Sequence, residues 1–87
     1  MKILWAHGLE SSADGSKPTW MIENLGWDVV SPAMSKNGWT IAEQTEVVVR
    51  AIEENDDLDV IMGSSYGGLA IANAAARFRD RPLRLVL

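Results

Sequence analysis

The chain has 87 residues, 47% hydrophobic and 23% charged, with a net charge of −4 and no cysteine. This length allows one domain at most, and the acidic balance argues against a nucleic-acid partner. The lack of cysteine excludes disulfides and thiolate metal sites. No segment has membrane-spanning length, and the first apolar run is shorter than a signal-peptide core. We therefore expect a cytoplasmic protein with no membrane partner.

The sequence predicts four strands that alternate with three helices. In chain order these are a strand at 3–6, a helix at 16–25, a strand at 27–31, a helix between Thr40 and the acidic tract 53–57, a strand at 58–62, a helix from 66 to about 78 and a strand at 83–87. Gly26 ends the first helix, and Thr40 with Glu43 forms a capping box for the second. We expect apolar side chains of the first two helices to pack on the sheet: Trp20, Met21, Ile22 and Leu25, then Ile41, Val48, Ala51 and Ile52.

Strands that alternate with helices indicate a doubly wound α/β fold with a parallel sheet. Right-handed crossovers with one reversal of direction give the strand order 2-1-3-4, with the first helix on one face and two on the other. In such sheets ligands bind at the carboxyl ends of the strands, where the order reverses. Here that point falls between His7-Gly8-Leu9 and the turn at 63–67.

A Gly-x-Ser-x-Gly turn lies between an apolar strand and a helix of small residues. Only Ser65 has glycine two residues before it (Gly63) and two residues after it (Gly67). The strand-turn-helix order is the context of the nucleophile elbow, in which a strained turn exposes the serine hydroxyl. We expect both glycines to be required because a Cβ atom there would collide with the converging strand and helix.

The His7-Gly8 loop and the turn at 63–67 together resemble the α/β-hydrolase superfamily, and the chain is most similar to small bacterial serine esterases that lack a lid. The resemblance runs over the whole chain, which would match the N-terminal half of such an enzyme. It implies that Ser65 attacks a small or medium acyl ester. It also implies that the backbone N–H groups of Tyr66 and Leu9 form the oxyanion hole, and that no cofactor or metal is needed.

In this family the serine acts together with an acid and a histidine, and the chain departs from the family in these two residues. There the acid and the histidine follow the serine, but the residues after Ser65 contain no histidine and one carboxylate, Asp80. Asp80 is predicted at the end of the sheet away from the site. The resemblance gives His7, the only histidine, a structural role in bracing the oxyanion loop. A role as a makeshift base is the alternative.

We therefore expect residues 1–87 to be a single partial domain, inactive alone, with the acid and histidine beyond this chain. The apolar strand at 83–87 is then an exposed sheet edge that could mediate self-association. Two other functions stay open, a non-catalytic α/β binding or interaction module and a phosphate or nucleotide binder.

Several other side chains invite a functional interpretation. Trp39, in the loop after the second strand, could line a substrate pocket. We expect the other tryptophans to pack in the core: Trp5, Trp20 and Trp27. Glu10 and Asp14 could be drawn as metal ligands, but no supporting residues have suitable spacing, so a solvated loop is the expectation.

Overall fold

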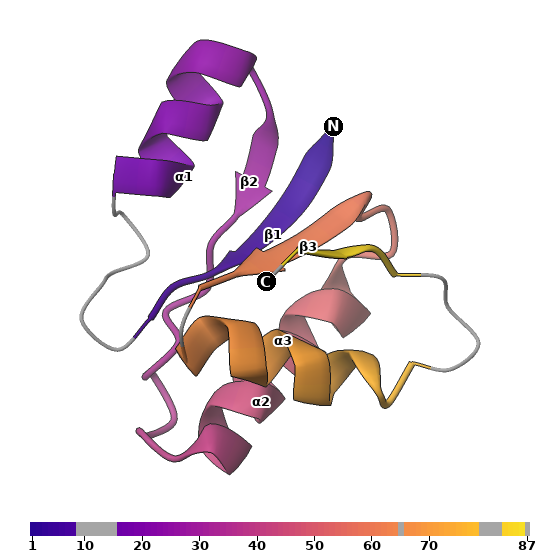
Figure 1. Cartoon of the computed structure of the whole chain (residues 1–87). Helices are drawn as coiled ribbons and strands as arrows, with labels where there is room; N and C mark the ends of the chain where they lie inside the picture. The colour runs from indigo at the N-terminus through magenta and orange to yellow at the C-terminus, as the bar shows by residue number, and fades with distance from the viewer. Residues whose placement is uncertain (9–15, 65, 79–82, 87) are drawn as a thin grey trace.

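The computed structural model describes residues 1–8, 16–64, 66–78 and 83–86. Its strands form one parallel sheet in the order β2-β1-β3-β4, which confirms the predicted fold class and strand order (Figure 1). The strands are β1 (Lys2–Ala6), β2 (Asp28–Val30), β3 (Val60–Gly63) and β4 (Leu85–Val86). β2 and β4 are shorter than predicted, and β3 begins two residues later.

The helices lie on the faces that right-handed crossovers require. They are α1 (Ser16–Trp20), which continues as the π-helical turn η1 (Met21–Leu25), α2 (Ile41–Glu54) and α3 (Tyr66–Ala75). Figure 1 shows α1 on one side of the sheet and α2 with α3 on the other. Gly26 ends η1 with a φ of 66°, a left-handed conformation that glycine adopts without strain.

The start of α2 confirms the predicted capping box. The Thr40 hydroxyl accepts a hydrogen bond from the Glu43 N–H at 3.1 Å, and the Glu43 carboxylate accepts one from the Thr40 N–H at 3.2 Å. These bonds satisfy backbone donors that the first turn of a helix leaves unpaired. The helix ends at Glu54, within the acidic tract, as the sequence predicts.

The two faces of the sheet carry hydrophobic clusters of very different size. The larger lies between the sheet and the helices α2 and α3, and its buried members are Leu4, Ala6, Met34, Val47, Val48, Val49, Ala51, Ile52, Ile61, Ala70, Ile71 and Ala74. The smaller has three buried members, Ile3, Trp5 and Met21, with half-buried side chains around them, Trp27, Val29, Val60 and Met62. Most of the core therefore lies on the α2–α3 side.

Four side chains of the first helix were expected to pack on the sheet, and this prediction is wrong for three of them. Met21 is buried, but Trp20, Ile22 and Leu25 are 55%, 51% and 42% exposed. The prediction assumed α-helical spacing, whereas the second half of this helix is a π-helical turn, whose wider hydrogen-bond spacing moves side chains off the expected stripe. Core packing is confirmed for Trp5 and wrong for Trp20, and Trp27 is half-buried.

Gln44 of α2 is a buried polar side chain. It is 1% exposed, and its Oε1 atom accepts no hydrogen bond from any residue that the structure describes. A buried acceptor without a partner lowers stability by about 1–3 kcal/mol. We predict that Gln44→Met, which keeps the side-chain volume, raises the free energy of unfolding by about 1–2 kcal/mol in urea titration. The matched variant Gln44→Ala should lower it, because it leaves a cavity. A loss of stability in Gln44→Met would contradict this prediction.

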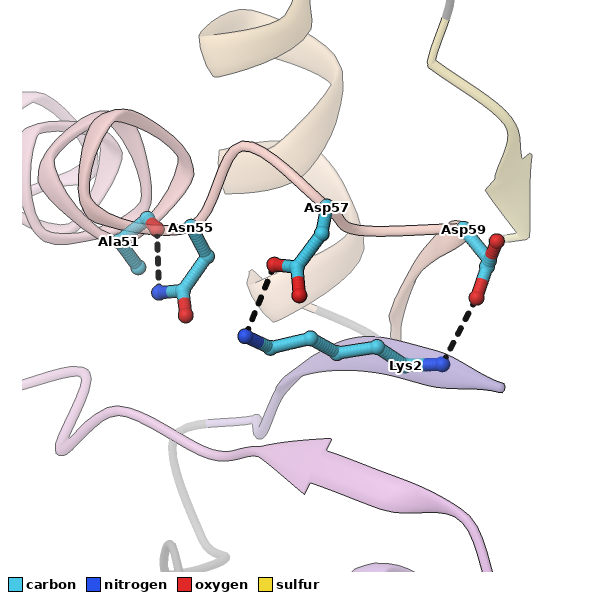
Figure 2. Close-up of polar contacts among 5 residues, drawn as sticks. All are labelled: Lys2, Ala51, Asn55, Asp57 and Asp59. Carbon is cyan, nitrogen blue, oxygen red and sulfur yellow. Dashed lines mark hydrogen bonds and ion pairs between the residues drawn. The ribbon is translucent and has the colours of Figure 1, made fainter.

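Lys2 ties the start of β1 to the segment that leads into β3 (Figure 2). Its ammonium group pairs with Asp57 at 2.9 Å, and its backbone N–H donates to the Asp59 carboxylate at 2.8 Å. The hydrogen bond to Asp57 is the main reason why the pKa of Lys2 lies above 10.5. These contacts connect the amino ends of β1 and β3, at the end of the sheet opposite the candidate site.

The raised pKa of Lys2 predicts a pH dependence of stability. Its stabilising contribution is complete below about pH 10.5 and is lost as the pH rises through the higher folded-state pKa. We expect the wild type to lose more stability than Lys2→Met on going from pH 9 to pH 12, by a small amount because Asp57 is mostly exposed. Parallel pH–stability curves for the two proteins would contradict the assignment.

Candidate functional site

The carboxyl ends of β1 and β3 meet at the candidate site. Ala6 at the end of β1 lies opposite Gly63 at the end of β3, so the loop from His7 and the turn from Ser64 begin side by side. The Ser64 N–H donates to the Ala6 carbonyl at 3.4 Å and extends the pairing by one residue. The described parts of the two predicted segments, at the ends of β1 and β3, therefore lie together where the strand order reverses.

Both glycines of the turn lie where no larger residue fits. A Cβ atom at Gly63 would come within 2.8 Å of the backbone carbonyl of Gly67. A Cβ atom at Gly67 would overlap the Ala6 carbonyl oxygen and lie 2.7 Å from the His7 carbonyl oxygen. The expected collision with the converging strand and helix is confirmed. The main chain of this turn is thus pressed against both α3 and the end of β1.

Tyr66 begins α3, and its backbone N–H has no acceptor among the described residues. The first N–H groups of a helix lack partners within the helix and attract negative charge. The next residue, Gly67, donates to the Ser64 carbonyl at 3.0 Å, which closes the turn. Within the described part of the chain the Tyr66 N–H is therefore an unpaired donor, one residue after the predicted nucleophile. Ser65 itself and Leu9, the second predicted oxyanion residue, lie outside the described residues.

His7 is buried, at 6% exposure, and both of its ring nitrogens are engaged. Nε2 accepts a hydrogen bond from the Met34 N–H at 3.2 Å, so the ring proton must be on Nδ1, which lies 2.9 Å from the Gly8 carbonyl and donates to it. The ring therefore links the loop after β1 to the loop after β2. This arrangement agrees with the predicted bracing role, and it leaves no ring nitrogen available to act as a base.

Trp39 lies in the loop after β2 and is 63% exposed. The Glu43 side chain lies against the chain on either side of it, since Thr40 is bonded to that carboxylate and a Cβ atom at Gly38 would overlap it. Gly38 also has a φ of 141°, which side-chain-bearing residues rarely adopt. Trp39 is thus a surface aromatic on a constrained loop, and its role in a substrate pocket stays a prediction.

A surface depression at the amino ends of β1, β3 and β4 does not coincide with the turn. It is lined by Met1, Leu58, Asp59, Val60, Leu83 and Arg84. The turn lies at the opposite edge of the sheet, so this depression is not counted as part of the candidate site. Three other predicted positions lie outside the described residues: Glu10, Asp14 and Asp80.

Sequence reasoning missed the part that Met34 plays. Its side chain is 1% exposed, and its backbone N–H holds the His7 ring. A backbone donor carries no residue-type signal, so no sequence pattern could have marked it. Within the described ranges no helix is long and apolar enough to cross a bilayer, and no group of three or more histidine, aspartate or glutamate side chains could hold a metal ion.

Comparison of the chain with protein-family models, curated proteins and solved structures finds no match. The functional interpretation therefore depends on the turn itself and on the residues around it.

Proposed function

We propose that this chain is the nucleophile-bearing part of a serine hydrolase of the α/β-hydrolase type, acting on small or medium acyl esters. The observation that carries the proposal is the close backbone approach on both sides of Ser65. Gly63 and Gly67 are each in contact with main chain that excludes a Cβ atom. A turn this sharp between a strand and a helix is what a nucleophile elbow needs to present a serine hydroxyl.

In the proposed mechanism the Ser65 hydroxyl attacks the ester carbonyl and forms a tetrahedral intermediate. The Tyr66 N–H donates to its oxyanion, with the Leu9 N–H as the second donor, and the amino end of α3 adds a favourable dipole. A serine hydroxyl also needs a base to accept its proton. Because both ring nitrogens of His7 are bonded, the proposal assigns the base and its acid partner to polypeptide outside these 87 residues.

A non-catalytic binding module is the second candidate, and the engagement of His7 favours it. In this second candidate there is no base among the described residues, and the sole function of the turn is the close packing of β3, α3 and β1. The two candidates differ in whether Ser65 is reactive. A structural turn gives its serine no advantage over other serines, whereas an elbow beside oxyanion donors raises reactivity even without a base. A catalytic triad that is dismantled still leaves about 10³–10⁴-fold acceleration over water.

The experiment is exposure of the 87-residue chain to a fluorophosphonate probe, with imidazole in the buffer as an external base. Trypsin cleavage after Arg50 and Arg77 places Ser64 and Ser65 in one peptide, and fragmentation by mass spectrometry locates the phosphonyl group. We expect modification of Ser65 in preference to every other serine, at a rate that imidazole increases. Modification spread evenly over the serines would support the non-catalytic module. Stabilisation by inorganic phosphate without modification would favour a phosphate-binding site.

A further inference from the structure

The face of the sheet that carries α1 and η1 is only half covered. A helix is about 10 Å wide and strands lie about 4.8 Å apart, so one helix covers about two strands. The helix packs through Met21 on Ile3 and Trp5 of β1, with Val29 of β2 beside them. Across the same face β3 and β4 have no helix over them among the described residues (Figure 1).

An apolar row of side chains crosses into the uncovered half. Residues paired in register across parallel strands share a face, so Trp5, Met62 and Val86 form one row across the sheet. Exposure increases along this row, because Trp5 is 9% exposed, Met62 is half-buried and Val86 is 46% exposed. The row thus leads from the covered half of the face to an open apolar edge.

The covered half carries exposed apolar side chains of its own. Trp20 and Ile22 lie on either side of the buried Met21, and Leu25 follows at the end of η1. All three are more than two-fifths exposed. On this face the α1–η1 helix forms a ridge with exposed apolar side chains. The bare β3–β4 half lies beside it, about one helix diameter below the top of the ridge.

We propose that this face binds a second copy of the same chain. A two-fold axis parallel to the strands, lying above this face over the boundary between β1 and β3, would bring the α1–η1 ridge of each protomer onto the bare β3–β4 half of its partner. Such an interface is isologous, since the same patch serves both protomers and no further surface is left for a third copy. The exposed Trp20, Ile22 and Leu25 would then cover Met62 and Val86 of the partner subunit.

Charge complementarity supports this pairing. Glu23 of η1 is exposed on the ridge, and Arg84, two residues before Val86, lies on the bare half. Neither forms an ion pair with any described residue. The two-fold arrangement brings these opposite charges together across the interface twice. The inference does not depend on the proposed hydrolase function.

Sedimentation equilibrium of the 87-residue chain tests the proposal. We expect a monomer–dimer equilibrium, and we expect Ile22→Lys and Val86→Lys each to weaken it by about tenfold or more, since a buried charge at an interface is unfavourable. Leu69→Lys is the matched control. Leu69 is also exposed, at 51%, but it lies on α3 on the opposite side of the sheet, so this variant should keep the wild-type equilibrium.

Charge reversal gives a second test that leaves the apolar surface unchanged. Glu23→Arg and Arg84→Glu should each weaken the dimer, and the double variant should restore most of the loss. Circular dichroism checks that each variant is folded. A wild-type monomer at all concentrations would overturn the proposal. So would a dimer that tolerates Ile22→Lys and both charge reversals, because an edge-paired dimer would behave in that way.

Discussion

Gly67→Ala should destabilise the protein by about 3 kcal/mol, the upper end of the usual cost of overpacking, because the added methyl group would meet main chain and not a movable side chain. Its Cβ atom would overlap the Ala6 carbonyl oxygen at the end of β1 and would also press on the His7 carbonyl. To accommodate it, α3 must move away from β1 or the turn must change its path. Either change breaks the packing of Ala70 and Ile71, which are fully buried behind the turn.

The matched control is Gly26→Ala, at the end of η1. A Cβ atom there would have nothing within 4 Å, but the φ of 66° costs a residue with a side chain about 1–2 kcal/mol. Gly67→Ala tests steric overlap, and Gly26→Ala tests backbone strain alone. Chemical denaturation measures the loss in the free energy of unfolding for each variant. An equal loss of stability in the two would show that the turn at Gly67 relaxes easily, which contradicts the elbow geometry.

Ester hydrolysis by the 87-residue chain should be negligible even if Ser65 is reactive towards a phosphonate. Intact enzymes turn over at about 1–10³ s⁻¹, and loss of the serine or histidine of a triad lowers turnover by about 10⁶-fold. The residues after Ser65 include no histidine, and His7 holds Met34 and Gly8 through its two ring nitrogens. We therefore expect release of p-nitrophenol from p-nitrophenyl butyrate to be close to the buffer rate.

His7→Gln is the variant that makes this prediction decisive. Turnover above about 1 s⁻¹ by the wild type, lost in His7→Gln with the fold intact, would identify His7 as the base. It would also show that the two hydrogen bonds of the ring break during the reaction. Absence of turnover in both proteins is the expected result, with a lower free energy of unfolding for His7→Gln, because the ring bonds are lost.

Much of the fold could be predicted because it follows from local rules. The cap formed by Thr40 and Glu43 and the stop at Gly26 depend on residues a few positions apart. The strand order follows from the handedness of crossovers, which does not depend on side-chain detail. The burial of Trp20 could not be predicted from local rules. Its burial depends on the phase of the helix, and the π-helical turn that shifts this phase has no clear sequence signal.

The candidate site also has one part that could be predicted from the sequence and one part that could not. The collisions at Gly63 and Gly67 could be expected because the turn motif itself specifies where strand and helix converge. The link between His7 and Met34 could not, because it joins residues 27 positions apart through a backbone N–H. The same long-range contact favours the bracing role of His7 over a role as a base, since it occupies the nitrogen that a base would need.

The most direct measurement of the central claim is the rate of fluorophosphonate labelling of paired variants, with imidazole present. Ser64 and Ser65 are adjacent, but only Ser65 lies between the glycines at 63 and 67. We predict that Ser65→Ala abolishes labelling of the turn and that Ser64→Ala keeps it near the wild-type rate. Labelling that persists in Ser65→Ala and disappears in Ser64→Ala would contradict the assignment of the nucleophile.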